Sequence, residues 1–260
     1  MKKENNTITF IIVNYNSSTE LNICLTDLSK INYASSFEVI IVNNDKKPVC
    51  LSQHNFKNQK VIEINKNIGY GSACNIGLNE VTTKFICFLN PDTLKFCKNL
   101  SKITTYLENS NTIVSPKILT TKNQPEPWSV GEKITLQQTL KNNFNLCTKK
   151  WLSTDIITTD WVSGAAMFST TKFVRDLNGF DEDFFLYFED VDLCQRATDC
   201  GGEIKYIPKF TLTHSNGCSS KDSTKKQKKC YYTSQDLFFK KHLGPTQTYF
   251  MQLCRFFHKN

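Results

Sequence analysis

Residues 8–16, ITFIIVNYN, join a short apolar run rich in β-branched residues to a polar cluster that follows it directly. Two later stretches repeat the pattern: 37–45 (FEVIIVNND) and 84–92 (KFICFLNPD). Runs that are apolar throughout are typical of strands buried on both faces of a sheet. Because ligands of parallel α/β sheets bind beyond the carboxyl ends of the strands, we expect the three polar clusters to meet at one site.

Helical spacing separates these strands and supports an α/β fold. Leu21, Leu25 and Leu28 lie on one face of an expected helix over 18–30. Strand and helix patterns that alternate in this way indicate a mostly parallel central sheet flanked by helices. The other elements expected in this half are helices at 71–80 and 96–108 and strands at 60–64 and 112–115.

The second half is less regular. Residues 117–160 are rich in Thr, Asn, Gln and Lys, which predicts a loop-rich insertion. Periodicity resumes with an expected strand over 160–169. The elements expected after it are helices at 171–177 and 189–200, an edge strand at 203–207, and tail helices at 225–243 and 246–258.

Composition excludes several classes of protein. The 260 residues are 39% hydrophobic and 22% charged, as in ordinary globular chains. No apolar run approaches the roughly 18–20 residues that span a bilayer, and the polar start has no signal-peptide core, so we expect a cytoplasmic location. The 11 cysteines are odd in number and form no CxxC pair, which argues against a disulfide framework or a zinc site.

The positive charge lies at the carboxyl end. The formal net charge is +8, and residues 221–260 contain nine Lys or Arg against two Asp. With several aromatic residues nearby, this basic tail predicts peripheral contact with an anionic membrane surface. Nucleic-acid binding is the weaker interpretation, because no recognition module surrounds the lysines.

Three groups of residues could carry chemistry. Asp92, held by the proline turn after a buried strand, could ligate Mg²⁺ or Mn²⁺, although an Asx turn that caps a helix would also explain it. The sequence from Gly69 to Cys74, GYGSAC, nearly matches a dinucleotide-binding loop but lacks its third glycine. A tight turn that lets backbone approach a ligand or neighbouring strand is the structural alternative.

The strongest group is acidic and aromatic. Residues 180–192, FDEDFFLYFEDVD, mix six carboxylates with five aromatic rings. Rings that exclude water can raise a carboxyl pKa toward that of a useful general base. A helix that starts at Glu189 would also favour acidic residues in its first turn. His214, after an expected strand, is a further candidate metal ligand.

The order of these motifs resembles that of family 2 glycosyltransferases with the GT-A fold, particularly the bacterial rhamnosyltransferase-like branch. The motifs are NYN at 14–16, NND at 43–45, NIGYGSACNIG at 67–77, LNPD at 89–92, GAAM at 164–167 and FEDVDLC at 188–194. The resemblance covers roughly residues 8–243. It implies an inverting, metal-dependent enzyme that takes a sugar from a dTDP- or UDP-sugar donor, with rhamnose suggested by the branch.

The resemblance also implies roles for single residues. Asp190 would be the general base, and Asp92 and His214 would hold Mg²⁺ or Mn²⁺. Trp161, Gly164 and Glu189 would contact a glycan or lipid-linked acceptor for surface polysaccharide synthesis at the inner membrane face. The donor would lie against Asn14, Tyr15, Asn16, Asn43, Asn44, Asn67, Gly69, Tyr70, Asn75 and Asn90.

The domain prediction follows from this resemblance. A GT-A domain would span 1–220, with a nucleotide-sugar half at about 8–116 and an acceptor half at 117–220, and the basic helical tail would span 221–260. Asn43 stands where the family often has Asp, which leaves base selection open; Asp45 could compensate. The alternatives are an NAD-dependent oxidoreductase, a nucleotidyltransferase and a catalytically inactive sugar-nucleotide-binding module.

Overall fold

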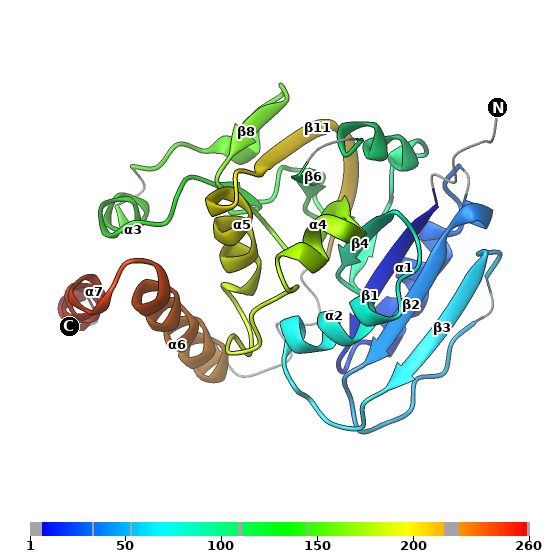
Figure 1. The fold of residues 1–260 in the computed structure, drawn as a ribbon, viewed down its shortest axis with the longest axis horizontal. Coiled ribbons are helices and arrows are strands. Elements are labelled where there is room, and N and C mark those ends of the chain that lie inside the picture. The colour runs from blue at the N-terminus through cyan, green and yellow to red at the C-terminus, as the bar shows by residue number, and fades with distance from the viewer. Residues whose placement is uncertain are drawn as a thin grey trace.

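The fold is built on a mixed, twisted sheet with helices on both faces (Figure 1). The computed structural model describes residues 7–258, except 33, 53, 109–110, 145 and 216–223. Within these residues the main sheet has nine strands. Their order is β3 (Asn58–Glu63), β2 (Glu38–Asn43), β1 (Ile8–Asn14), β4 (Phe85–Leu89), β10 (Ala166–Thr170), β6 (Thr112–Leu119), β11 (Glu203–His214) and β5 (Thr93–Leu94), with β8 (Ile157–Thr159) also paired to β11.

The amino-terminal half has the predicted parallel arrangement. Strands β1 to β4 pair in parallel, and every residue of β1 is buried. Phe10 and Ile12 pack in the cluster that includes α1 (Ser18–Leu28), and Ile11 and Val13 pack in the cluster that includes α2 (Tyr70–Asn79). Alternate side chains of one strand therefore contact helices on opposite faces, which explains its continuous apolar sequence.

The second half is partly antiparallel and corrects two predictions. Residues 160–169 form two strands, β9 (Trp161–Val162) and β10, and the latter runs antiparallel between β4 and β6. The predicted edge strand at 203–207 is instead a long interior strand, β11. Its pairing with β6 shifts register between Ile207 and Thr211, around Pro208, which has no N–H to donate to a ladder.

Two more expectations change. The helix expected at 96–108 is the 3₁₀ helix η2 (Leu100–Tyr106). The stretch predicted as a loop-rich insertion contains the end of β6 and several short elements. They are β7 (Val130–Gly131), which pairs with β9, α3 (Leu136–Asn143), η3 (Lys150–Leu152) and β8. The remaining short elements are η1 (Ala34–Ser36) and α4 (Thr171–Asp176).

The carboxyl-terminal helices form a hairpin beside the sheet. In Figure 1, α6 (Thr224–His242) and α7 (Pro245–His258) lie at the side of the molecule near α3 and α5 (Glu189–Asp199). Phe238, Phe239 and Met251 of these helices pack with Phe184 and Phe188 in a third buried cluster. Among the described helices, none combines the length and apolar character that crossing a bilayer requires.

Candidate active site

A cavity of about 780 Å³ opens at the carboxyl ends of β1, β2 and β4. The opposite wall comes from α6 and α7. Of the predicted site residues, those that line the cavity are Tyr15, Asn16, Asn44, Asn67, Gly69, Tyr70, Asn90, Asp92, Trp161, Gly164, Glu189, Asp190 and His214. The fold thus brings the predicted metal and base residues and most of the predicted donor residues to one cavity.

Asp92 and His214 meet because strands β5 and β11 are paired. His214 lies opposite Thr93 in that antiparallel pair. Its Nε2 is 3.1 Å from an Asp92 carboxylate oxygen, and its Nδ1 is 3.1 Å from both carboxylate oxygens of Glu126. Burial alone would lower the pKa of His214, but the hydrogen bonds with Asp92 and Glu126 outweigh it and raise that pKa to about 10.

The donor set is suited to a divalent ion that shares its ligands with a diphosphate. No three His, Cys, Asp or Glu side chains of the described chain form a complete cage for a metal. Mg²⁺ is commonly held by one or two carboxylates together with substrate phosphates. The Asp92 oxygen and the adjacent His214 Nε2 would therefore hold such an ion only in part, and His214 would release a proton on binding it. An Asx helix cap does not form at 90–92, since a strand, β5, follows the turn.

Asp190 is fixed at the cavity wall by two backbone donors. It lies in the first turn of α5, where Gly164 N donates to one carboxylate oxygen and Val191 N to the other, both at 2.8 Å. Tyr70 donates its hydroxyl to the Gly164 carbonyl at 3.1 Å. Burial raises the pKa of Asp190, although these backbone bonds favour the ionised form. The carboxylate is thus oriented and poorly solvated, as a general base needs.

Glu189 is the more deeply buried neighbour. Its side chain is 6% exposed, and its Oε2 has no hydrogen-bond partner among the described residues. Burial, and then the nearby Asp190 charge, raise the pKa of Glu189 to about 8. Two adjacent carboxyls in such a site favour sharing one proton, so Glu189 would stay protonated while Asp190 carries the charge.

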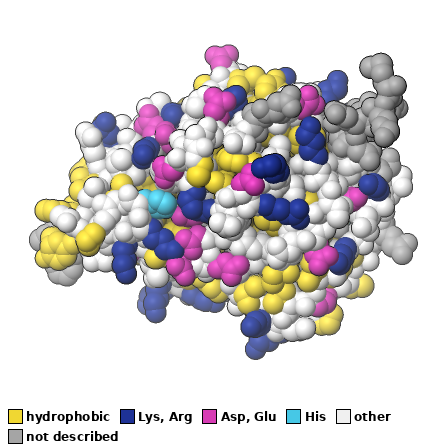
Figure 2. Space-filling view, in the orientation of Figure 1, with side chains coloured by type: hydrophobic (Ala, Val, Ile, Leu, Met, Phe, Trp, Pro, Cys, Tyr) yellow, Lys and Arg dark blue, Asp and Glu magenta, His cyan; other side chains and the backbone are white. Residues whose placement is uncertain are grey.

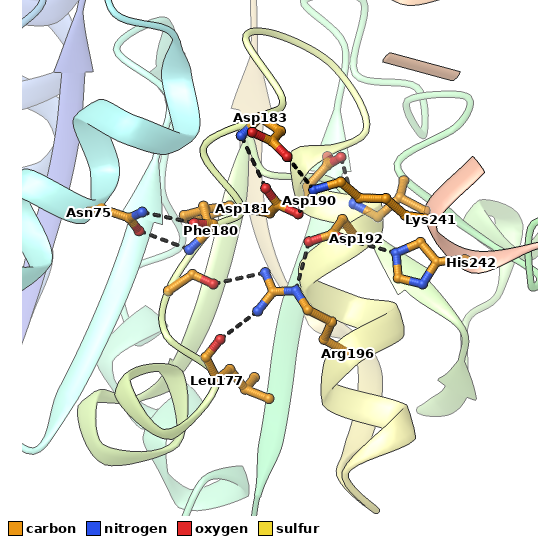
Figure 3. Close-up of polar contacts among 12 residues, drawn as sticks. Asn75, Leu177, Phe180, Asp181, Asp183, Asp190, Asp192, Arg196, Lys241 and His242 are labelled. Carbon is orange, nitrogen blue, oxygen red and sulfur yellow. Dashed lines mark hydrogen bonds and ion pairs between the residues drawn. The ribbon is translucent and has the colours of Figure 1, made fainter. Parts of the chain in front are cut away.

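Three predicted donor residues are absent from the cavity wall. Asn14 and Asn43 are fully buried, and the Asn14 amide donates to the Asn43 side chain at 2.7 Å. Asn43 also donates to Glu63 at 2.5 Å. The Asn75 side chain donates to the Phe180 carbonyl and accepts from the Phe180 N–H, both at 2.8 Å, as Figure 3 shows. In this structure these amides hold loops together.

Asn44 both lines the cavity and holds a loop in place. It lines the cavity, and its side chain donates to Asn67 and to the Gly69 carbonyl and accepts from Ile68 N. Gly69 has φ +96°, and a β-carbon there would lie 2.6 Å from the Phe185 carbonyl oxygen. The glycine therefore allows close approach of a neighbouring backbone segment, which explains the dinucleotide-like motif without a pyrophosphate.

Helix α6 holds the segment that precedes the proposed base. Tyr187 and Phe188 have φ of +69° and +67°, an unfavourable region for such residues that surrounding contacts must maintain. Ser234 donates to the Leu186 carbonyl at 2.7 Å. In Figure 3, Lys241 points at Asp181 and Asp183, and His242 points at Asp192.

The His242 contact reaches α5 itself. Asp192 is 1% exposed and lies 2.7 Å from both His242 Nε2 and Arg196 Nε. Arg196 also donates to the carbonyls of Leu177 and Gly179 (Figure 3). The start of α5, which carries Asp190, is thus tied to both α6 and the loop before it.

Sequence reasoning missed Glu126 and the whole α6–α7 wall. Glu126 lies in the stretch that we expected to be a variable loop, and nothing local links it to His214, 88 positions away. For the tail, the sequence predicts a membrane-binding surface, with nucleic acid as the weaker alternative, and it does not predict these tail residues on the cavity wall. They are Lys226, Gln227, Cys230, Tyr231, Tyr232, Gln235, Met251 and Arg255.

Similarity to solved structures defines the class of fold. The structure resembles Staphylococcus aureus TarS residues 1–349 in complex with UDP-GlcNAc (TM-score 0.57, 17% identity, 89% of this chain and 65% of that one). It also resembles GalNAc-T7 with UDP, GalNAc and Mn²⁺ (TM-score 0.57, 14% identity, 80% of this chain and 44% of that one). The fold is GT-A, as predicted.

The family follows from the sequence comparison. The model of glycosyl transferase family 2 matches residues 9–174, and the chain belongs to that family. Rhamnosyltransferase WbbL of Escherichia coli (strain K12) is 29% identical over 161 residues, which are 56% of this chain and 60% of the relative. Hexosyltransferase Agl10 of Haloferax volcanii is 24% identical over 196 residues, which are 73% of this chain and 61% of the relative.

These matches confirm the predicted family and its rhamnosyltransferase-like character. They favour a transferase over the NAD-dependent oxidoreductase. The chain spans about 60% of the length of these two curated relatives.

Proposed function

We propose that the chain is an inverting, metal-dependent glycosyltransferase that moves a hexose, with rhamnose the first candidate, from a dTDP- or UDP-sugar. The observation that carries this proposal is the position of Asp190. Its carboxylate lies on the wall of a cavity that Asp92 and His214 also line, together with residues of α6 and α7. A base that shares one cavity with a candidate metal site is the arrangement that a single displacement needs.

The reaction would proceed in one step. Asp190 takes the proton of an acceptor hydroxyl as that oxygen forms a bond to the anomeric carbon. The bond from this carbon to the diphosphate oxygen breaks, and the nucleoside diphosphate leaves with the electron pair. Attack opposite the leaving group inverts the configuration without a nucleophilic carboxylate. When bound, Mg²⁺ or Mn²⁺ supplies positive charge that stabilises the departing diphosphate.

The division of the chain is part of the proposal. Residues 8–116 would bind the nucleotide sugar, residues 117–220 would contact the acceptor, and the tail at 221–260 would complete the acceptor wall. Asn14, Asn43 and Asn75 would act by positioning the loops that contact the donor. The acceptor would be a glycan or a lipid-linked glycan of surface polysaccharide synthesis, used at the inner face of the cytoplasmic membrane.

Ligand-induced stabilisation tests the donor part. We expect one of dTDP, UDP and GDP, with Mn²⁺, to raise the melting temperature, because a ligand of the folded state stabilises it. The matching nucleotide sugar should then be consumed with an acceptor. A shift with NAD alone would overturn the proposal. A nucleotide shift without turnover across glycan and lipid-linked acceptors would indicate an inactive binding module.

Exposed apolar side chains on α7 support the membrane contact. Tyr249 and Phe250 are 61% and 51% exposed, and Figure 2 shows hydrophobic side chains at that end of the molecule. We expect the double variant Tyr249→Ser, Phe250→Ser to lose co-flotation with anionic vesicles. Ile23→Ser, at a residue 50% exposed on α1, is the control. Unchanged flotation of the double variant would contradict the membrane contact.

A further inference from the structure

A second hollow lies between α6 and α7 and is strongly basic. Its volume is about 460 Å³, and Lys225, Lys228, Lys229 and Arg255 line it with a single carboxylate, Asp236. That carboxylate is already paired with Arg255 at 2.7 Å. Three lysine charges therefore remain without a balancing anion among the described lining residues. Figure 2 shows Lys and Arg side chains near the lower end of α6.

These lysines oppose the stability of their own helix. Lys225 is three positions from Lys228 and four from Lys229, spacings at which like charges repel on a helix surface. All three lie in the first turns of α6, where positive charge also opposes the helix dipole. No carboxylate of the described residues pairs with them. A bound anion would offset both the repulsion among the lysines and their unfavourable interaction with the helix dipole.

The hollow lies next to the candidate active site. Tyr232 and Arg255 line both the hollow and the main cavity. The Arg255 guanidinium lies 4.3 Å from the centre of the Tyr232 ring, and its pairing with Asp236 fixes it there. The hollow and the cavity that contains Asp190 are therefore separated by no more than these two side chains.

We propose that this hollow binds a phosphate or diphosphate group of the acceptor, an inference that rests on the proposed function. Lysine and arginine side chains commonly bind phosphate in proteins. The donor diphosphate is assigned to the other end of the cavity, beside Asp92, so this second basic site serves a different phosphate. The adjoining wall has apolar side chains, Tyr231 and Met251, that suit a non-polar portion of the same molecule.

Isothermal titration calorimetry in EDTA tests the assignment, since EDTA removes the metal that donor-site binding needs. The probes are farnesyl diphosphate, inorganic pyrophosphate and farnesol. We expect farnesyl diphosphate to bind, pyrophosphate to bind more weakly, and farnesol not to bind measurably. The triple variant K225Q/K228Q/K229Q should bind farnesyl diphosphate at least tenfold more weakly. The triple variant K98Q/K102Q/K122Q removes the same charge from exposed lysines elsewhere and should bind normally.

Other results would overturn the site. Equal weakening in both triple variants would indicate a general charge effect. Pyrophosphate binding as tight as that of farnesyl diphosphate would indicate a free phosphate as the ligand. Loss of anionic-vesicle flotation with intact farnesyl diphosphate binding would assign the lysines to a membrane surface.

The donor assay separates this inference from the proposed function. Both triple variants should keep the nucleotide- and Mn²⁺-dependent thermal shift. If that shift is present but the unmodified chain does not bind farnesyl diphosphate, the phosphate site is wrong and the proposed function stands. If no nucleotide gives a shift in any of the three proteins, the donor assignment fails, and the lysine dependence of farnesyl diphosphate binding then decides the phosphate site alone.

Discussion

The two ends of the cavity are built from different kinds of structure. At the donor end, Tyr15, Asn44 and Asn90 each follow a parallel strand, so short local motifs place them together. At the other end, the wall comes from α6 and α7, which come after all of the strands in the chain. The proposed donor end thus follows from strand order, and the proposed acceptor end depends on contacts such as that of His242 with Asp192. Variants at the two ends should therefore differ in whether they lose nucleotide binding or lose stability and turnover.

The largest expected effect is on the rate, at the point where the two ends meet. Asp190→Asn removes the base while it keeps the size of the side chain, and general-base catalysis typically contributes about 10²–10⁴-fold. We expect a loss of that order in sugar transfer, measured by nucleoside diphosphate release, with the nucleotide-induced thermal shift retained. Asp199→Asn, at the other end of α5, is the control. A loss smaller than about tenfold would remove Asp190 from this role.

The second prediction breaks the donor end alone. Asp92→Asn removes the carboxylate charge beside His214 and should weaken Mn²⁺-dependent nucleotide binding by at least about tenfold. Titration calorimetry with Mn²⁺ and the nucleotide measures this loss. Farnesyl diphosphate binding in EDTA should not change, because that ligand is assigned to the other end. Asp176→Asn on α4 should behave like the unmodified chain, and equal affinity in Asp92→Asn would exclude Asp92 as a ligand.

The third prediction breaks the contact between α6 and α5. His242→Ala leaves the buried Asp192 carboxylate one hydrogen bond short, which should lower the free energy of unfolding by about 1–3 kcal/mol. The turnover number should fall, since the start of α5 carries Asp190, and the donor KM should stay close to its original value. Lys240→Ala is the matched control for urea unfolding and kinetics, because Lys240 is exposed and lies two residues before His242. A purely structural role would lower stability without this split between turnover number and KM.

The smallest expected effect is the pH dependence of stability at Glu189. The pKa of this carboxyl rises from 4.5 in the unfolded chain to about 8 in the folded one, so the folded state holds its proton more tightly. The free energy of unfolding should therefore fall as pH rises between about 4.5 and 8. Glu189→Gln cannot ionise and should be more stable than the unmodified chain at pH 8.5, by about 1 kcal/mol or more.

Urea unfolding at pH 5 and pH 8.5 measures the Glu189 effect. At pH 5 the two proteins should differ much less, because the glutamate is protonated when folded. Glu203→Gln, which removes an exposed carboxylate, should show no such change with pH. A constant difference between Glu189→Gln and the unmodified chain across this range would contradict the burial argument.

Deleting the tail would be a poor test of membrane binding, because the tail also contacts the segment that precedes Asp190. Ser234, Lys241 and His242 contact the segment 181–192, and Phe238 and Phe239 pack against it. Removal of 221–260 would therefore disturb the strained residues before Asp190 as well as the exposed face of α7. Surface substitutions at Tyr249 and Phe250 separate the two effects.

Much of the donor end could be predicted from the sequence. The apolar runs at 8–13, 37–42 and 84–89 are strands because only a doubly covered sheet buries every residue of such a run. The boundaries of α1, α2 and α5 lie within about two residues of those predicted, a usual uncertainty for helix ends. The errors include η2 and the short elements within 117–160. They also include β9, β10 and β11, because a local pattern cannot show whether a run forms one strand or two, or which strands flank it.

The sequence by itself determined the fold family, the parallel strands and the residues at their carboxyl ends, because each of these depends on local periodicity and on motif order. Only the tertiary structure decided that Glu126 binds His214, that Asn75 holds Phe180, and that the basic tail forms a wall of the cavity. Glu126 and His214 are 88 positions apart in the sequence, and Asn75 and Phe180 are 105 positions apart. These contacts exist because packing buries polar groups that must then find partners, and the partners are chosen by proximity in space, which no local pattern encodes.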